Sequence, residues 1–226
     1  MSLKAYIRES KLSNFRIKNT QVFIKNKIPN ILDSEIKLAV EKAFKKIPEF
    51  LLQNLDVIYI GDFQYLKDRK IQALFKDSSI FMTNQYESTN DMIDDIIHEV
   101  AHSVEEQYPS LIYSDGKIEK EFIQKRKQLW QILKSESHNY ELHKFLQPDY
   151  DRDLDDFFYL EVGYPTIAML TVNLFYSPYA VTSLREYFAN GFEAFFMNED
   201  VIRLKNVSPL LYNKLLELLN LQNRED

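Results

Sequence analysis

A pair of histidines four residues apart constrains this chain more than any other sequence feature. His98 and His102, with Glu99 between them, stand within residues 91–107, where apolar side chains recur every three or four positions. This periodicity predicts an amphipathic helix. Four residues are about one helical turn, so both imidazoles leave the same side of the helix, next to its apolar stripe.

Two imidazoles one turn apart can bind a single Zn²⁺ and leave room for a third protein ligand and a water. Glu99 stands beside them, where its carboxylate can take a proton from that water. This H-E-x-x-H arrangement is typical of zinc-dependent peptidases. The competing interpretation is a core helix with two hydrogen-bonded histidines. We favour the metal because the motif lies at the boundary of the apolar and polar faces, and because the chain has only four histidines.

Composition narrows the class of protein. With 226 residues, 45% of them hydrophobic, the chain can bury the core of one domain, residues 1–226, in one or two lobes. A net charge of −6 without a Lys/Arg cluster argues against a nucleic-acid partner. The absence of Cys removes disulfides and thiol nucleophiles.

Hydropathy bears on localisation. No apolar run reaches about 18 residues, so we expect no membrane span and a soluble protein. The polar start of the sequence predicts no secretory signal peptide. A cytoplasmic protein, or one exported without a signal peptide, fits this pattern.

The first half of the sequence predicts a small sheet with two helices. We expect strands at 20–25, 56–60 and 79–84, and helices at 33–53, bent or broken near Pro48, and at 91–107. The first helix would be capped by Asp33 or Ser34, and the second by Thr89 or Asn90. The strand at 79–84 precedes the motif helix so closely that we expect it to form the edge of the cleft, where an extended peptide could pair with it.

The second half of the sequence is predominantly helical. We expect helices at 117–135, 139–146, 183–197 and 208–219. The chain is therefore α+β, with a small N-terminal sheet lobe over about 1–108 and a helical C-terminal lobe over about 109–226. Asp151, Asp153 and Asp155 resemble the start of a calcium loop. Such a loop needs Gly where Asp156 stands and Glu where Val162 stands, so we expect a solvated acidic turn.

A zinc site needs a third protein ligand, and the residues just after the motif do not supply it. The extended pattern H-E-x-x-H-x-x-G-x-x-H fails because Glu105 and Tyr108 occupy its last two fixed positions. Further along, Glu119 or Glu121 could be a thermolysin-like third ligand, but Ile123 and Lys125 stand where an Asp would follow four residues later. His138 and His143 are possible in principle, but each is isolated among polar residues.

The helix at 183–197 offers a better candidate. Glu186, Asn190 and Glu193 share one face, while Leu and Phe residues cover the other. A helix this aromatic should be buried on most sides, and a buried carboxylate needs a partner, which zinc can be. Two other interpretations stay open, a capping box formed by Ser183 with Glu186 and a plain solvated face.

Together the two motifs resemble the catalytic domain of the anthrax lethal factor family, which includes the related bacterial Pro-Pro endopeptidases. That family pairs H-E-x-x-H with a downstream Tyr-x₆-Glu-[Phe/Tyr]-Phe-Ala motif, matched here by Tyr179 and by Glu186 followed by Tyr-Phe-Ala. The resemblance covers roughly residues 55–108 and 176–198.

The resemblance implies a zincin-like metallopeptidase with a Glu as third ligand. In it His98, His102 and Glu186 would bind Zn²⁺, Glu99 would be the general base, and Tyr179 would face the developing oxyanion.

Two features depart from the family pattern. The long separation of the two motifs implies an inserted helical segment within about 110–165. Asn190 also replaces the acidic residue expected one turn after the ligand Glu.

We therefore expect a zinc-dependent endopeptidase acting on a peptide or protein substrate bound in extended form. One alternative is a catalytically inactive zinc-binding module of the same fold, and another is a zinc-dependent amidase acting on a non-protein substrate. The presence of both Glu99 and Tyr179 favours an enzyme, because a structural zinc site needs neither side chain.

Overall fold

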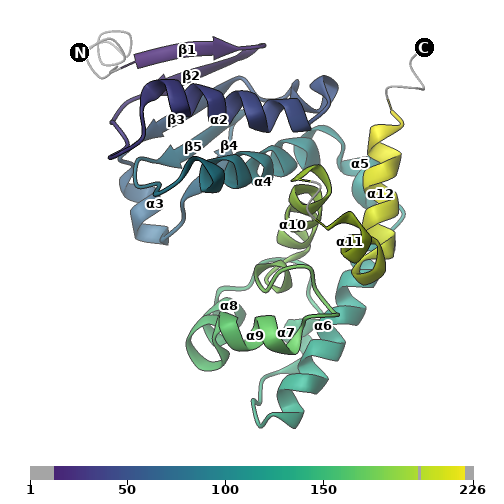
Figure 1. The fold of residues 1–226 in the computed structure, drawn as a ribbon. Helices are drawn as coiled ribbons and strands as arrows, with labels where there is room; N and C mark the ends of the chain where they lie inside the picture. The colour runs from purple at the N-terminus through teal and green to yellow at the C-terminus, as the bar shows by residue number, and fades with distance from the viewer. Residues whose placement is uncertain (1–12, 198–199, 222–226) are drawn as a thin grey trace. The chain divides into compact units, whose positions relative to one another are not determined.

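A computed structural model describes residues 13–197 and 200–221 and shows an α+β protein, as expected (Figure 1). The chain divides into two compact units, Met1–Gln107 and Tyr108–Asp226. The first contains all of the described strands and the second is helical. None of the described helices combines the length and apolar character needed to cross a bilayer.

The first unit is built on a mixed five-stranded sheet with the order β1-β2-β3-β5-β4. Its strands are β1 (Ser13–Ile17), β2 (Thr20–Ile24), β3 (Val57–Gly61), β4 (Ala73–Lys76) and β5 (Ser79–Thr83). The three central strands, β2, β3 and β5, are parallel, and the two edge strands pair antiparallel. The sequence predicted the three central strands and missed both edges.

The core of this unit lies on one face of the sheet. Alternate strand residues, among them Val22, Ile58 and Ile80, are fully buried, as the two-residue period of a strand requires. Helices α2 (Asp33–Lys46) and α4 (Thr89–Gln107) lie side by side (Figure 1) and bury their apolar stripes. The packing of α4 therefore determines the direction in which its histidine-bearing side faces.

The first helix breaks near Pro48, as expected, but it differs from its prediction in its N-terminal cap. The N-cap is Leu32, whose backbone N–H donates to Glu35 Oε2 at 2.8 Å, so the expected capping by Asp33 or Ser34 is wrong. The helix stops at Lys46 because the residue before Pro48 is forced into extended geometry. The short 3₁₀ helix η1 (Glu49–Leu52) replaces the end of the predicted helix.

The expectation that residues 79–84 form the edge of the sheet is also wrong. β5 pairs with β3 on one side and with β4 on the other. The edge is β4, which has only four residues and follows the short helix α3 (Gln64–Arg69), so it gave no periodic signal.

Helix α4 starts two residues earlier than its predicted span. Thr89 is its first helical residue, and Ser88 Oγ accepts the backbone N–H of Asp91 at 3.2 Å. Ser88 therefore does the capping expected of Thr89 or Asn90.

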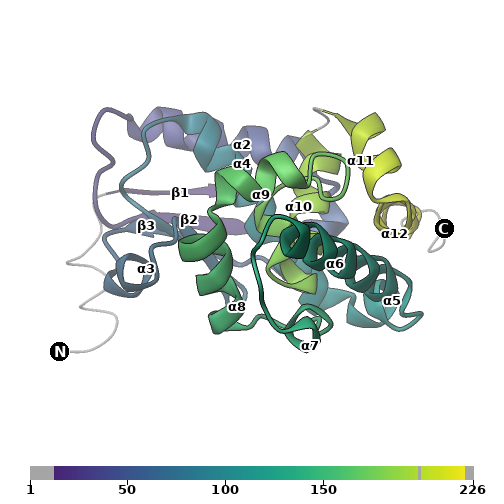
Figure 2. The ribbon, with the colours of Figure 1, turned by 90° about the horizontal axis from the view of Figure 1, so that it is seen from below.

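The second unit is a helical assembly. Its α-helices are α5 (Pro109–Tyr113), α6 (Lys117–Ser135), α7 (Leu142–Phe145), α8 (Arg152–Asp156), α9 (Tyr164–Leu170), α10 (Leu184–Met197), α11 (Val201–Val207) and α12 (Pro209–Leu219). A π-helix, η2 (Phe157–Val162), and a 3₁₀ helix, η3 (Tyr179–Val181), lie between them. Figure 2 shows α10 among α6, α11 and α12, against which it packs.

The second half of the prediction is correct for the longer helices. The helix predicted at 117–135 is α6 without change, and those at 183–197 and 208–219 begin one residue later. The acidic segment is helix α8 and not a turn, because Asp151 Oδ1 accepts the backbone N–H of Leu154 at 3.0 Å and caps it.

Candidate metal centre

Helix α4 holds the two histidines in one orientation. Their ring centroids are 5.2 Å apart, and His102 is only 7% exposed. Ile97 and Val100, which flank the motif in sequence, are fully buried, so the apolar stripe of α4 anchors this turn. The histidines therefore lie beside the core and not in it, as the sequence predicted.

A third side chain on α4 orients His102. Nδ1 of His102 lies 2.7 Å from Oε2 of Glu105, which is buried at 5% exposure. A carboxylate at Nδ1 favours the tautomer with its proton there, which directs the lone pair to Nε2 for a metal. In the sequence, Glu105 stands out only as a departure from a longer motif. Its position three residues after His102 on a helix was the signal for this contact.

Glu99 lies at the β4 edge of the described sheet. Its Oε2 accepts the backbone N–H of Phe75, in β4, at 2.5 Å. Gln72 O accepts the N–H of Thr83, so antiparallel alternation turns the backbone groups of Ala73 and Phe75 away from β5. The carboxylate next to the first histidine is therefore placed where an added strand would run.

Tyr65 in α3 is a phenol near Glu99 that sequence reasoning missed. Burial, and then the negative charge of Glu99, raise the pKa of Tyr65 to about 12, while Arg69 opposes the shift. Its hydroxyl therefore stays protonated at neutral pH and can donate a hydrogen bond.

In the second unit, Glu186 lies in the first turn of α10. Ser183 Oγ accepts the backbone N–H of Glu186 at 3.1 Å, which is the Ser183 half of the capping box that was the alternative interpretation. Asn190, one turn later, donates its Nδ2 to the backbone carbonyl of Glu186 at 2.8 Å. Asn190 Oδ1 also accepts a short hydrogen bond from the Ser177 hydroxyl.

These contacts tie the segment before α10 to the helix. The Ser177 oxygen accepts the backbone N–H of Ala180 at 3.2 Å, so Asn190 links the short helix η3 to the first turn of α10. Asn190 thus connects the segment that carries Tyr179 with the turn that carries Glu186 within this unit. Tyr179 is 39% exposed, and its ring meets that of Tyr164 edge-on with centroids 6.0 Å apart.

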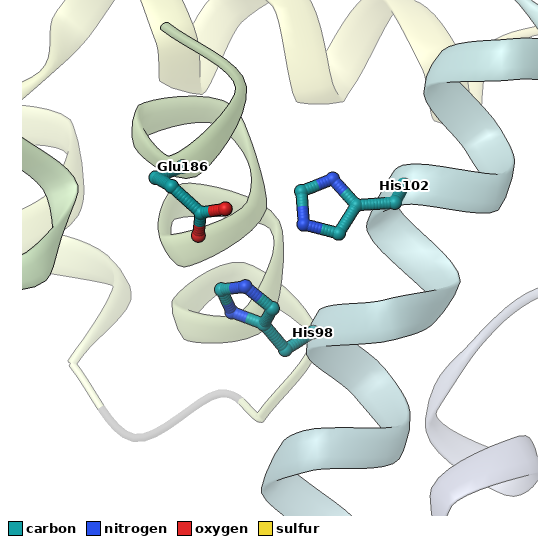
Figure 3. A group of neighbouring side chains, drawn as sticks. All are labelled: His98, His102 and Glu186. Atoms are coloured by element: carbon teal, nitrogen blue, oxygen red, sulfur yellow. The ribbon is translucent and has the colours of Figure 1, made fainter. Parts of the chain in front are cut away.

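His98, His102 and Glu186 form one group of potential metal ligands (Figure 3). Each offers one ligand atom, and these atoms all lie within 4.8 Å of one another. Zinc bonds of about 2.0–2.2 Å in tetrahedral geometry bring ligand atoms to roughly 3.5 Å. Two imidazoles and one carboxylate are also a donor set that zinc prefers in catalytic sites. The residues therefore fit this metal.

The other candidate ligands are placed elsewhere. Among the described residues, no group of potential metal ligands includes Glu119, Glu193, His138 or His143. Glu121 is committed to structure, since it accepts hydrogen bonds from the Tyr187 hydroxyl at 2.7 Å and from the first backbone N–H groups of α12 at 2.9 and 3.1 Å.

Comparisons of the chain with protein-family models, with curated proteins and with solved structures found no match.

Proposed function

We propose that this protein is a zinc-dependent endopeptidase of the zincin type, similar to the anthrax lethal factor family. The observation that carries the proposal is the grouping of His98, His102 and Glu186, with Glu99 next to the first of them in sequence. Zn²⁺, when bound by these three residues, lowers the pKa of a coordinated water and polarises a carbonyl. The remaining chemistry belongs to side chains of this chain.

Glu99 is the general base in this proposal. Its carboxylate accepts a proton from the water that attacks the peptide carbonyl and then gives that proton to the departing amine. The peptide C–N bond breaks and the products are a carboxylic acid and an amine. The Tyr179 hydroxyl donates a hydrogen bond to the carbonyl oxygen as negative charge develops on it, an interaction stronger in the transition state than in the substrate.

We assign the extended substrate to the edge strand β4. The backbone groups of Ala73 face away from β5, and a peptide strand added there would be paired through its main chain. Glu99 lies at the same edge, where it accepts a hydrogen bond from the backbone N–H of Phe75. An added peptide would therefore pass directly by the proposed general base.

Measurements of activity distinguish the two alternative functions from an endopeptidase. An inactive zinc-binding module would bind zinc without hydrolysis, and an amidase would hydrolyse small amides but not peptides. Glu99 at the open strand edge favours the endopeptidase, because an extended chain fits an edge and a small amide does not need one.

The test is cleavage of a random peptide library by protein loaded with zinc. We expect cleavage inside peptides that a chelator abolishes and added zinc restores. Glu99→Gln should reduce the rate by several orders of magnitude while zinc stays bound, because it removes the base but not a ligand. Tyr179→Phe should lower kcat with unchanged zinc affinity. Near-normal turnover of the Glu99→Gln variant would rule out the proposal.

A further inference from the structure

The second unit contains a pocket of about 290 Å³ at the start of α10. It is lined by Tyr113, Glu119, Pro148, Asp149, Tyr150, Ser183, Leu184 and Arg185. Five of these eight residues, Tyr113 to Tyr150, come from the segment that separates the two sequence motifs. The segment that departs from the family pattern therefore builds most of this pocket.

We propose that this pocket binds the side chain of a lysine or arginine residue of the substrate. That this side chain belongs to a substrate rests on the proposed peptidase function, whereas the choice of a cationic side chain rests on the pocket alone. Its volume is at the lower limit of about 300–1,000 Å³ for pockets that hold whole small molecules. A single long side chain matches this size better than a complete ligand does.

The walls of the pocket are apolar and aromatic. Tyr113, Pro148, Tyr150 and Leu184 provide faces on which the methylene stem of a long side chain can pack. The two tyrosine rings also attract a cation, because the face of an aromatic ring carries partial negative charge.

The pocket is held in shape by hydrogen bonds that do not involve its occupant. The backbone N–H of Leu184 donates to Pro148 O at 2.8 Å, which fastens the loop to α10. The Tyr150 hydroxyl donates to Asp155 Oδ2 at 2.8 Å, and this fixes the direction of its ring. Asp155 Oδ1 also accepts the Tyr164 hydroxyl at 2.6 Å, so the carboxylate is held from both sides.

The charges at the pocket favour a cation. Glu119 and Asp149 both have exposed side chains, and among the described residues neither forms an ion pair. Arg185 supplies one positive charge, so two carboxylates and one guanidinium leave a net charge of −1. An ammonium or guanidinium group at the mouth would balance it.

The position of the pocket connects it with the proposed centre. Ser183, Leu184 and Arg185 line the pocket, and Glu186 is the next residue of the chain. Ser183 Oγ accepts the Glu186 N–H, so one side of the pocket and the proposed ligand belong to a single hydrogen-bonded helix start. A bound side chain would thereby align a substrate along α10.

The first test measures binding without catalysis. N-acetyl-arginine amide is titrated into ¹⁵N-labelled protein and the backbone amide shifts are followed by NMR, with N-acetyl-norleucine amide as the uncharged probe of similar length. We expect saturable shifts at Tyr150, Ser183 and Leu184 with the arginine probe and at least tenfold weaker binding of the norleucine probe. Equal binding of the two probes, or no shift at these residues, would overturn the proposal.

Matched variants test which carboxylates bind the cationic probe. Glu119→Gln with Asp149→Asn should weaken binding of the arginine probe about tenfold or more. Glu136→Gln, at the other end of α6 and also exposed, should leave binding unchanged. Binding that the double variant does not weaken would contradict the assigned carboxylates.

The second test uses peptides and separates this inference from the proposed function. If the protein cleaves library peptides, the cleaved sites should carry Lys or Arg at one fixed position, and the double variant should lose that preference through KM. Cleavage without such a preference would overturn the inference and leave the peptidase intact. Absence of any cleavage, with the arginine probe still bound, would overturn the peptidase instead.

Discussion

Glu99 Oε2 accepts the backbone N–H of Phe75 at 2.5 Å, so the proposed general base also joins α4 to the edge strand β4. A hydrogen bond to a charged group contributes about 1.5–3 kcal/mol. In the proposed function this side chain therefore has both a chemical and a structural role, and the two can be separated by choice of substitution.

The first prediction uses this separation. Glu99→Ala should lower the free energy of unfolding by about 1.5–3 kcal/mol, whereas Glu99→Gln keeps an acceptor for Phe75 and should lose clearly less. Both variants should be inactive. Denaturant unfolding of the zinc-free proteins measures the difference, and equal stability of the two variants would show that the contact with β4 contributes little.

The second prediction concerns the third ligand. Glu186→Ala should weaken zinc binding markedly, while Glu193→Ala, two turns further along the same helix, should change it little. Competition with a chromogenic chelator measures both affinities, after elemental analysis has shown one zinc per chain. A larger loss in Glu193→Ala would mean that the wrong carboxylate was assigned.

The third prediction concerns Glu105, which orients His102. Glu105→Ala should lower zinc affinity by about 10–100-fold, as is typical when an outer partner of a ligating histidine is removed. Glu106→Ala, on the exposed side of the same helix, is the control and should have no effect. An unchanged affinity in Glu105→Ala would show that His102 keeps its orientation without the carboxylate.

The fourth prediction is a pH dependence of stability. Burial, and then the nearby Asp95 carboxylate, raise the pKa of Tyr86 well above its ordinary value of 10.0. The folded state therefore retains the phenol proton above pH 10, where the unfolded chain loses it. Stability from this group is complete below pH 10 and falls as the pH rises beyond it.

Tyr86→Phe tests this dependence. The wild-type free energy of unfolding should fall more steeply than that of the variant above pH 10, by up to about 1.4 kcal/mol for each pH unit. Parallel curves between pH 9 and 11 would contradict the prediction. The variant removes the hydrogen bond to Asp95 at every pH, so the slope and not the offset is the measurement.

The fifth prediction concerns the packing of α10 on α12. A Cβ atom built on Gly191 would lie 2.3 Å from Leu211 Cδ2, and Leu211 is buried. Gly191→Ala should therefore destabilise the protein by about 1–3 kcal/mol, as overpacked cores do. Gly191→Ala combined with Leu211→Ala should show less than additive loss in denaturant unfolding, since the second change removes the clash.

The elements that the sequence predicted are those with a long periodic signal. Helices α4, α6 and α10 have 19, 19 and 14 residues, enough for an apolar stripe to repeat. Strand β4 has four residues and β1 has five, and neither stands out from its polar surroundings. The error over the sheet edge follows directly, because β5 could only be recognised as internal once β4 was known.

The candidate site likewise contains residues that could be predicted from local spacing and contacts that could not. His98, His102 and Glu99 are set by local helix geometry and could be predicted from spacing. The contact of Glu99 with Phe75 depends on the antiparallel register of β4 and β5, which no local pattern specifies. The role of Asn190 could not be predicted either, because it depends on the position of Ser177, thirteen residues earlier.

The order of the strands along the chain also has a consequence for biosynthesis. Every strand pairing that the structure describes, and the helices α2 and α4, are contained in residues 13–107. Domains generally fold as units, the N-terminal one first during translation. We therefore expect the sheet and α4 to be complete on the ribosome before α10 is synthesised. The histidine pair would then exist as a folded half-site before Glu186 emerges, and zinc acquisition would be a late, post-translational step.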